Sequence, residues 1–179
     1  MTQHEYIFIA VSIILGLAIT RLLHTVGMIT RAHDRVIFHW SSALWGFSIL
    51  FYILQLWWVG WGLRNIEEWT FLHFIILVIG STFLYGAAEM AFSVPDEGTF
   101  DMLQHSQQLG RLSALSMLLY FLVGPYVNIF MYNNAIIPSL AIPSMGILLM
   151  VLVITIPARF KLWSLLFSIY SLLVVVLTV

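Results

Sequence analysis

The spacing of the few charged residues is the feature that most constrains this sequence. They divide an otherwise apolar chain into stretches of about twenty residues, the length of a helix that spans the hydrocarbon core of a bilayer. Arg, Lys, Asp and Glu make up 8% of the 179 residues and hydrophobic residues 61%, whereas soluble domains carry about a quarter charged residues. A soluble fold of this size could not bury so much apolar surface, so lipid must be the solvent.

Cutting the chain at its charges and turns predicts an all-α, polytopic transmembrane bundle of about six helices, a single domain over residues 1–179 without a soluble part. The expected spans are about 6–30, 36–63, 69–92, 112–132, 139–156 and 162–179. Pro138 and Pro143 interrupt the fifth stretch, and five spans with a re-entrant segment over about 133–143 are the alternative.

Basic residues predict the orientation of these spans. Loops with more Lys and Arg stay in the cytoplasm, and the second loop contains only Arg64. The basic residues of the first, third and fifth loops are Arg31, Arg35, Arg111, Arg159 and Lys161. We therefore expect these odd loops to be cytoplasmic, both termini to be extracytoplasmic, and the protein to reside in a plasma or inner membrane.

Four ionisable residues within or beside the expected spans form the first candidate site. Arg21 and His24 lie on the first span, His39 on the second and Glu89 on the third. Because successive spans run in opposite directions, all four fall at the cytoplasmic side. Ionisable residues within membranes usually face a protein interior or a water-filled cavity, so the sequence predicts one intramembrane polar layer.

Two ridges of small and polar residues indicate how this layer forms. They are Ser12, Gly16, Thr20 and His24 on the first span, and Thr82, Tyr85, Gly86 and Glu89 on the third. Small residues let helices approach closely, so we expect spans one and three to pack and Arg21 to meet Glu89. The alternatives for this pair are a structural ion pair, an ion or proton relay, or an Arg21 that extends to the headgroups.

Two further groups of polar residues are weaker candidates. The fourth span contains Pro125 and then Asn128, whose amide can bond to a neighbouring helix or line a cavity; the secondary cavity candidates are Thr20, Thr82, Tyr85 and Asn128. The polar stretch 93–111 is either a solvated connector or a place where a divalent cation binds. Its candidate residues are Asp96, Glu97, Asp101 and His105.

Neither a cofactor nor a metal is expected. A haem needs two axial ligands that face each other across a bundle, and His24 and His39 lie at the ends of one hairpin, which is a poor match. The chain has no cysteine and no metal-binding spacing such as HExxH. Nucleophile triads and glycine-rich phosphate loops are also absent, so the sequence favours a non-enzymatic role and leaves an enzyme open.

The composition and the small bundle bear on partners and function. A net charge of −1 gives no reason to expect nucleic acid. Six short helices enclose little space, so we expect the lipid bilayer and either further copies of the chain or a membrane partner subunit. The leading hypothesis is a channel-like, ion- or proton-conducting homo-oligomer. The alternatives are a non-conducting accessory or scaffold subunit, and a haem-binding redox protein.

Overall fold

The computed structural model describes residues 2–66, 68–92 and 99–178 and is almost entirely helical. The elements in chain order are α1 (Gln3–Arg31), β1 (Val36–Ile37), α2 (Trp40–Gly62), η1 (Leu63–Asn65), α3 (Phe71–Ala91), β2 (Phe100–Asp101), α4 (Met102–Gln108), α5 (Gly110–Tyr126), η2 (Val127–Met131), α6 (Ile136–Thr155), η3 (Pro157–Arg159) and α7 (Phe160–Thr178). Six helical segments in these described ranges are long and apolar enough to cross a membrane. The predicted six-helix, all-α architecture is confirmed.

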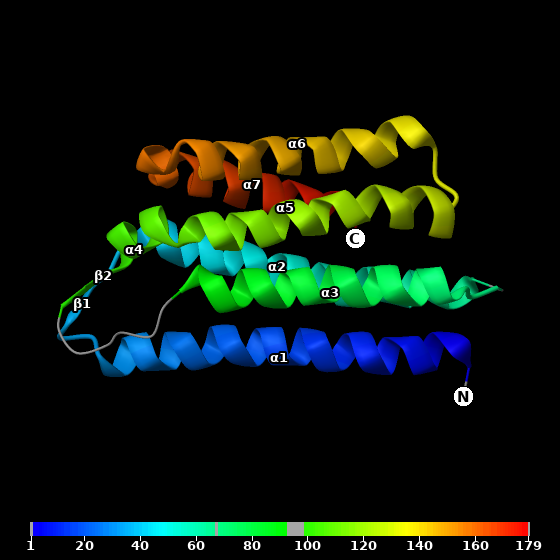
Figure 1. Ribbon diagram of the computed structural model, residues 1–179, viewed down its shortest axis with the longest axis horizontal. Coiled ribbons are helices and arrows are strands. Elements are labelled where there is room, and N and C mark those ends of the chain that lie inside the picture. Colours follow the sequence, from blue (N-terminus) through cyan, green and yellow to red (C-terminus); the bar gives the residue numbers. More distant parts are fainter. Residues whose placement is uncertain (1, 67, 93–98, 179) are drawn as a thin grey trace.

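The long helices form two layers (Figure 1). One layer is a row in the order α1, α3, α5, α6, in which each helix packs mainly on the next. The second layer consists of α2 and α7, which pack on each other; α2 also contacts α1 and α3, and α7 contacts α6. One face of the four-helix row is therefore covered by α2 and α7, and the described residues leave the opposite face uncovered.

Side chains that cap the backbone explain where several helices begin and end. Thr2 accepts a hydrogen bond from the Glu5 amide while the Glu5 carboxylate accepts one from the Thr2 amide, which is a capping box at the start of α1. Thr70 and His73 form the same arrangement before α3, so this helix begins at Phe71 rather than at 69. The helix α6 ends before Pro157, because a proline disfavours helical backbone at the preceding residue.

The prolines inside helices do not break them. Pro143 lies within the continuous helix α6, so the five-span alternative with a re-entrant segment over 133–143 is wrong. Asn133 has a φ of 53°, a left-handed conformation that asparagine tolerates well, and it forms the turn before α6. After Pro125 the end of α5 continues as the π-helical turn η2, which agrees with the way such turns accompany helix irregularities.

A small parallel sheet closes one end of the bundle. Val36 pairs with Phe100 and Ile37 with Asp101, so the connection after α1 is joined to the connection before α4. Two-residue strands carry too little pattern to be predicted from sequence. They bring the α1–α2 and α3–α4 connections together at the end where α1 and α3 finish (Figure 1).

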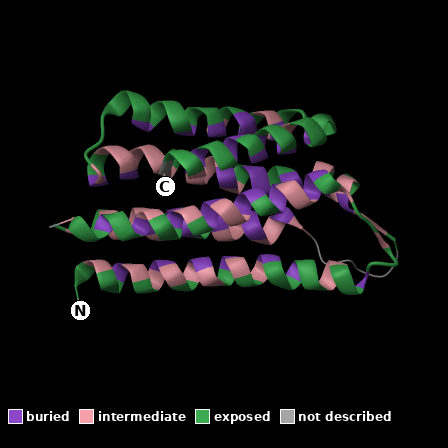
Figure 2. Cartoon of the chain, turned by 180° about the vertical axis from the view of Figure 1, so that it is seen from behind, coloured by how far each residue is buried: buried purple, intermediate pink, exposed green. Residues whose placement is uncertain are grey.

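The interior of the bundle is filled by large aromatic side chains. Trp45 of α2 is fully buried against the rings of Phe160 and Phe167 of α7, with centroid distances of 5.6 and 5.0 Å. Tyr52 of α2 stacks on Phe167 and meets the edge of Phe121 of α5. These rings fix α2, α5 and α7 against one another, and Figure 2 shows buried residues gathered between the helices.

Candidate functional site

Arg21 of α1 and Glu89 of α3 form an ion pair. The Nε atom of Arg21 lies 2.7 Å from Oε2 of Glu89. The Nε–H group does not point at this oxygen well enough for a hydrogen bond, so the contact is electrostatic. Tyr85, one turn before Glu89, donates a long hydrogen bond of 3.5 Å from its hydroxyl to the same carboxylate oxygen. Arg21 of α1 and Tyr85 of α3 thus both contact the carboxylate of Glu89.

Arg21 and Glu89 lie at different distances from the ends of their helices. Glu89 lies two residues before Ala91, the last residue of α3, whereas Arg21 lies ten residues before Arg31, the last residue of α1. At 1.5 Å per residue, the extra eight residues of α1 correspond to about 12 Å. Figure 1 shows that α1 extends beyond α3 at this end. The pair lies near the end of α3 but well inside the apolar stretch of α1.

The pair faces the uncovered side of the four-helix row. Each side chain retains 36% of its accessible surface. Other polar residues of the two helices are exposed or half-exposed beside it. We define the α1/α3 polar face as Thr20, Arg21, His24, Thr82, Tyr85 and Glu89. The expected residues therefore meet on an outer face and do not line the interior of the bundle.

The small-residue ridge of α1 also faces outward. The buried side of α1 consists of Ile7, Val11, Leu15, Ala18, Leu22 and Thr25. On the opposite side, an added Cβ at Gly16 or Gly27 would meet no atom within 4 Å. The expectation that the Ser12–His24 ridge packs on span three is wrong, because α3 contacts the larger apolar side chains of α1. Ser12 lines a groove beside α2, and Gly16, Thr20 and His24 are left free to contact another chain.

His39 lies apart from this face and caps a helix. Its Nδ1 accepts from the Ser41 amide at 3.2 Å and lies 2.7 Å from the Ser41 hydroxyl, at the start of α2. Burial lowers the pKa of His39 and the nearby Lys161 lowers it further, while Asp101 opposes the shift. His24 is exposed on α1. The two histidines therefore have different surroundings: His39 lies apart from Arg21 and Glu89, and a shared layer of Arg21, His24 and Glu89 stays a prediction.

The loop candidates are only partly described by the structure. Asp96 and Glu97 lie outside the described residues. Asp101 caps α4, where one carboxylate oxygen accepts from the amides of Leu103 and Gln104. His105 packs on the ring of Phe100 at 5.4 Å, and burial lowers its pKa. Over residues 2–66, 68–92 and 99–178 no group of three or more ligating side chains could hold a metal ion.

Asn128 lines a cavity in the other half of the bundle. This cavity has a volume of about 140 Å³ and lies among α2, α3, α5, α6 and α7. Its other polar lining residues are Tyr52, Gln55, Tyr120 and Tyr170. Neither Arg21 nor Glu89 lines it, so the two polar regions do not form one path within a single chain.

A stripe of polar and aromatic residues on the buried face of α2 was missed by the sequence analysis. It consists of Ser41, Trp45, Ser48, Tyr52 and Gln55, whose spacing of three and four residues places them on one face. Ser48 shares a hydrogen bond of 2.8 Å with Ser168 of α7, and the neighbouring Ser42 shares one of 2.7 Å with Ser106 of α4. The spacing of these five residues along the sequence was the signal from which the stripe could have been predicted. Such bonds between helices hold membrane bundles together.

Comparison of the chain with protein-family models, with curated proteins and with solved structures finds no match. The fold therefore defines the class of the protein by itself: the six apolar helices of the described ranges make it a small multi-pass integral membrane protein. The α1/α3 polar face is the feature from which its function is inferred.

Proposed function

We propose that several copies of the chain assemble with their α1/α3 polar faces turned toward one another, and that the assembly conducts small ions or protons between the copies. The observation that carries this proposal is the Arg21–Glu89 pair, a third exposed on a face that no other part of the described chain covers. Ionisable groups within membranes are costly unless they face protein or water. A second copy would supply that surrounding.

The face is also suited to self-association. It carries one cation and one carboxylate, and in a symmetric interface the same patch occurs on both partners. Arg21 of one copy can therefore approach Glu89 of the next without leaving a charge unpaired. The small side chains at Gly16 and Thr20 let the α1 helices of two copies approach closely.

The polar residues cover about a third of the path that this proposal requires, because the hydrocarbon core is roughly 30 Å thick. From Glu89 to Thr82 the polar side of α3 extends over seven residues, about 10 Å of helix. Toward the other end the exposed residues Leu72 and Ile79 on α3 are apolar. Charged rings select ions in channels and apolar constrictions close them by excluding water. The proposed path has a polar entrance followed by an apolar gate.

The packed interior favours a path between chains over one through a single chain. Trp45, Phe160 and Phe167 are fully buried and occupy the space between α2 and α7. These rings lie between the cavity beside Asn128 and the end of the bundle that β1 and β2 close. Neither residue of the ion pair lines this cavity.

Flux through liposomes that contain the purified protein tests the proposal. Glu89→Gln removes the charge at the entrance and is expected to change proton or cation flux at least fivefold. Leu72→Ser places a hydroxyl group in the apolar gate, which lets water enter it, and is expected to raise flux. Glu68→Gln, at an exposed carboxylate in the α2–α3 connection, is the matched control and should conduct like the unmodified protein. Equal flux for all four proteins, or none above empty liposomes, contradicts the proposal.

A second candidate is a non-conducting accessory subunit whose α1/α3 face binds a different membrane protein. The exposed apolar residues of α3 beyond Thr82 support it, because Leu72 and Ile79 present the surface that a partner helix would cover. Affinity purification from membranes distinguishes the two: a stoichiometric second protein lost on Ile79→Asn supports the accessory role, and copies of this chain alone support the oligomer.

A further inference from the structure

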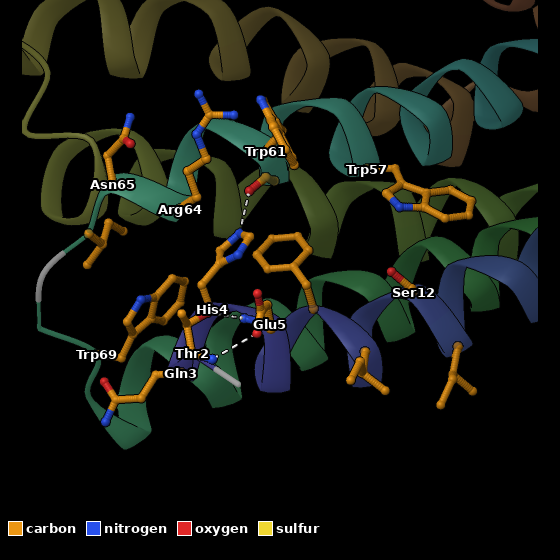
Figure 3. A pocket seen from close by; sticks show the side chains of 15 residues that line it. Thr2, Gln3, His4, Glu5, Ser12, Trp57, Trp61, Arg64, Asn65 and Trp69 are labelled. Carbon is orange, nitrogen blue, oxygen red and sulfur yellow. Dashed lines mark hydrogen bonds between the residues drawn. The ribbon is translucent and has the colours of Figure 1, made fainter.

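A groove lies between α1 and α2 at the end of the bundle opposite the ion pair (Figure 3). Its volume is about 1210 Å³. The floor forms where α1 docks on α2: Nε2 of His4 lies 3.0 Å from the carbonyl oxygen of Gly60, and the Phe8 ring occupies the space that a side chain at position 60 would need. Beyond this contact the groove is lined by Ser12 of α1 and Trp57 of α2 (Figure 3).

The lining of the groove changes from polar to apolar along its length. At the helix ends it is lined by Thr2, Gln3, Glu5, Arg64 and Asn65, and deeper in the bundle by Ile9, Ile13 and Trp57. From position 2 to position 13 of α1 the groove extends about 16 Å, half of the roughly 30 Å hydrocarbon core. A polar end and an apolar body of this length match the headgroup and upper acyl chains of a lipid in one leaflet.

The basic side of the groove is formed by Arg64. Its guanidinium lies over the ring of Trp61, 4.2 Å from the ring centroid, an interaction that holds the cation in place. Across residues 2–66, 68–92 and 99–178 no carboxylate forms an ion pair with this guanidinium. Its N–H groups are available to a phosphate, which a guanidinium binds with two parallel hydrogen bonds.

The acidic side of the groove is formed by Glu5 on α1. One of its carboxylate oxygens accepts from the Thr2 amide at 2.8 Å. The aromatic side chains at this end of the groove include Trp61 and Trp69, and aromatic faces attract ammonium groups. The groove thus has one cation, on η1, and one anion, on α1 (Figure 3).

We propose that this groove binds one glycerophospholipid with a zwitterionic headgroup. The headgroup phosphate binds Arg64, the ammonium group lies against Glu5 and the tryptophan rings, and an acyl chain occupies the apolar part beside Ile9, Ile13 and Trp57. An anionic lipid without an ammonium group fits less well, because Glu5 repels it. A groove of this size exceeds the roughly 300–1,000 Å³ of sites for small ligands, which agrees with a lipid.

Lipid retention by the purified full-length protein tests this inference. The protein in detergent is mixed with equal amounts of phosphatidylethanolamine and phosphatidylglycerol, and native mass spectrometry counts the lipid that stays bound. We expect at least fivefold more phosphatidylethanolamine than phosphatidylglycerol. Arg64→Gln should reduce the retention of both lipids at least fivefold, because the phosphate contact is common to them.

Two variants and one soluble ligand separate specific binding from its alternatives. Glu5→Gln keeps the capping box and should reduce the preference for phosphatidylethanolamine while total retention persists. Arg35→Gln, at an exposed arginine in the connection after α1, should behave like the unmodified protein. Glycerophosphoethanolamine, which has no acyl chains, should not displace the lipid at equal concentration. Displacement by it shows a phosphate site rather than a lipid site, and equal retention with Arg64→Gln or no lipid preference overturns the inference.

Discussion

Trp45 of α2 donates a hydrogen bond from its indole nitrogen to the hydroxyl oxygen of Ser113 in α5, at 3.0 Å. Ser113 in turn donates to the carbonyl oxygen of Ala87 in α3, at 2.8 Å. Trp45, Ser113 and Ala87 are fully buried. One hydroxyl group therefore joins the two layers of the bundle, because α3 and α5 belong to the four-helix row and α2 belongs to the second layer.

Ser113→Ala is expected to lower the free energy of unfolding by about 1–2 kcal/mol, since it leaves the buried Trp45 N–H without an acceptor. A denaturant titration in mixed micelles measures this change. Ser144→Ala is the control, because Ser144 is exposed on α6 and its hydroxyl bonds only within its own helix. Equal stability of the two variants would show that the Trp45–Ser113 bond contributes nothing.

Gly146→Ala is expected to destabilise the bundle by about 1–3 kcal/mol through overpacking. An added Cβ would lie 2.8 Å from the ring of Phe121. That ring is buried and surrounded by Tyr52, Tyr120 and Tyr170, so it cannot move aside. At Gly124 the nearest atom would be 3.6 Å away, in Pro143, and Gly124→Ala should unfold like the unmodified protein. Thermal unfolding followed by tryptophan fluorescence compares the two.

Acid is expected to destabilise the end of the bundle that β1 and β2 close, because His105 of α4 takes up a proton there. Burial lowers the pKa of His105 in the folded protein below its ordinary value of 6.5, so the unfolded chain binds the proton more readily. Stability is therefore full above about pH 6.5 and falls as the pH drops from 6.5 toward the lowered pKa. Unfolding measured at pH 7.5 and 5.5 should show this loss. His105→Gln should reduce the loss, and His33→Gln, at an exposed histidine in the α1–α2 connection, should leave it as in the unmodified protein.

Much of the fold could be predicted from sequence because charges and prolines mark where the spans end. Arg31, Arg64 and Pro157 each stand at or beside the end of a long helix. The meeting of Arg21 with Glu89 also follows from their similar depth. The direction in which this pair faces could not be predicted, because both sides of α1 are apolar: Leu15 faces the bundle, and Leu17, just as hydrophobic, is 54% exposed.

Other parts of the site depend on contacts that sequence does not encode. His39 shares its expected depth with Arg21, but its ring is held at the start of α2 by Ser41, so depth alone misplaced it. The groove beside Arg64 depends on how α1 packs on α2, where the Phe8 ring lies against Gly60. Such packing distances between helices cannot be read from the spacing of residues within them.

Disulfide cross-linking in native membranes tests most directly whether α1/α3 polar faces of neighbouring copies meet. The chain has no cysteine, so a single introduced cysteine reports only its own surroundings. Thr82→Cys, at an exposed position of the face, is predicted to give a covalent dimer under mild oxidation. Leu148→Cys, on an exposed side of α6, is predicted to remain monomeric. A Thr82→Cys protein that stays monomeric, or a Leu148→Cys protein that cross-links equally well, would contradict the assembly on which the proposed conduction depends.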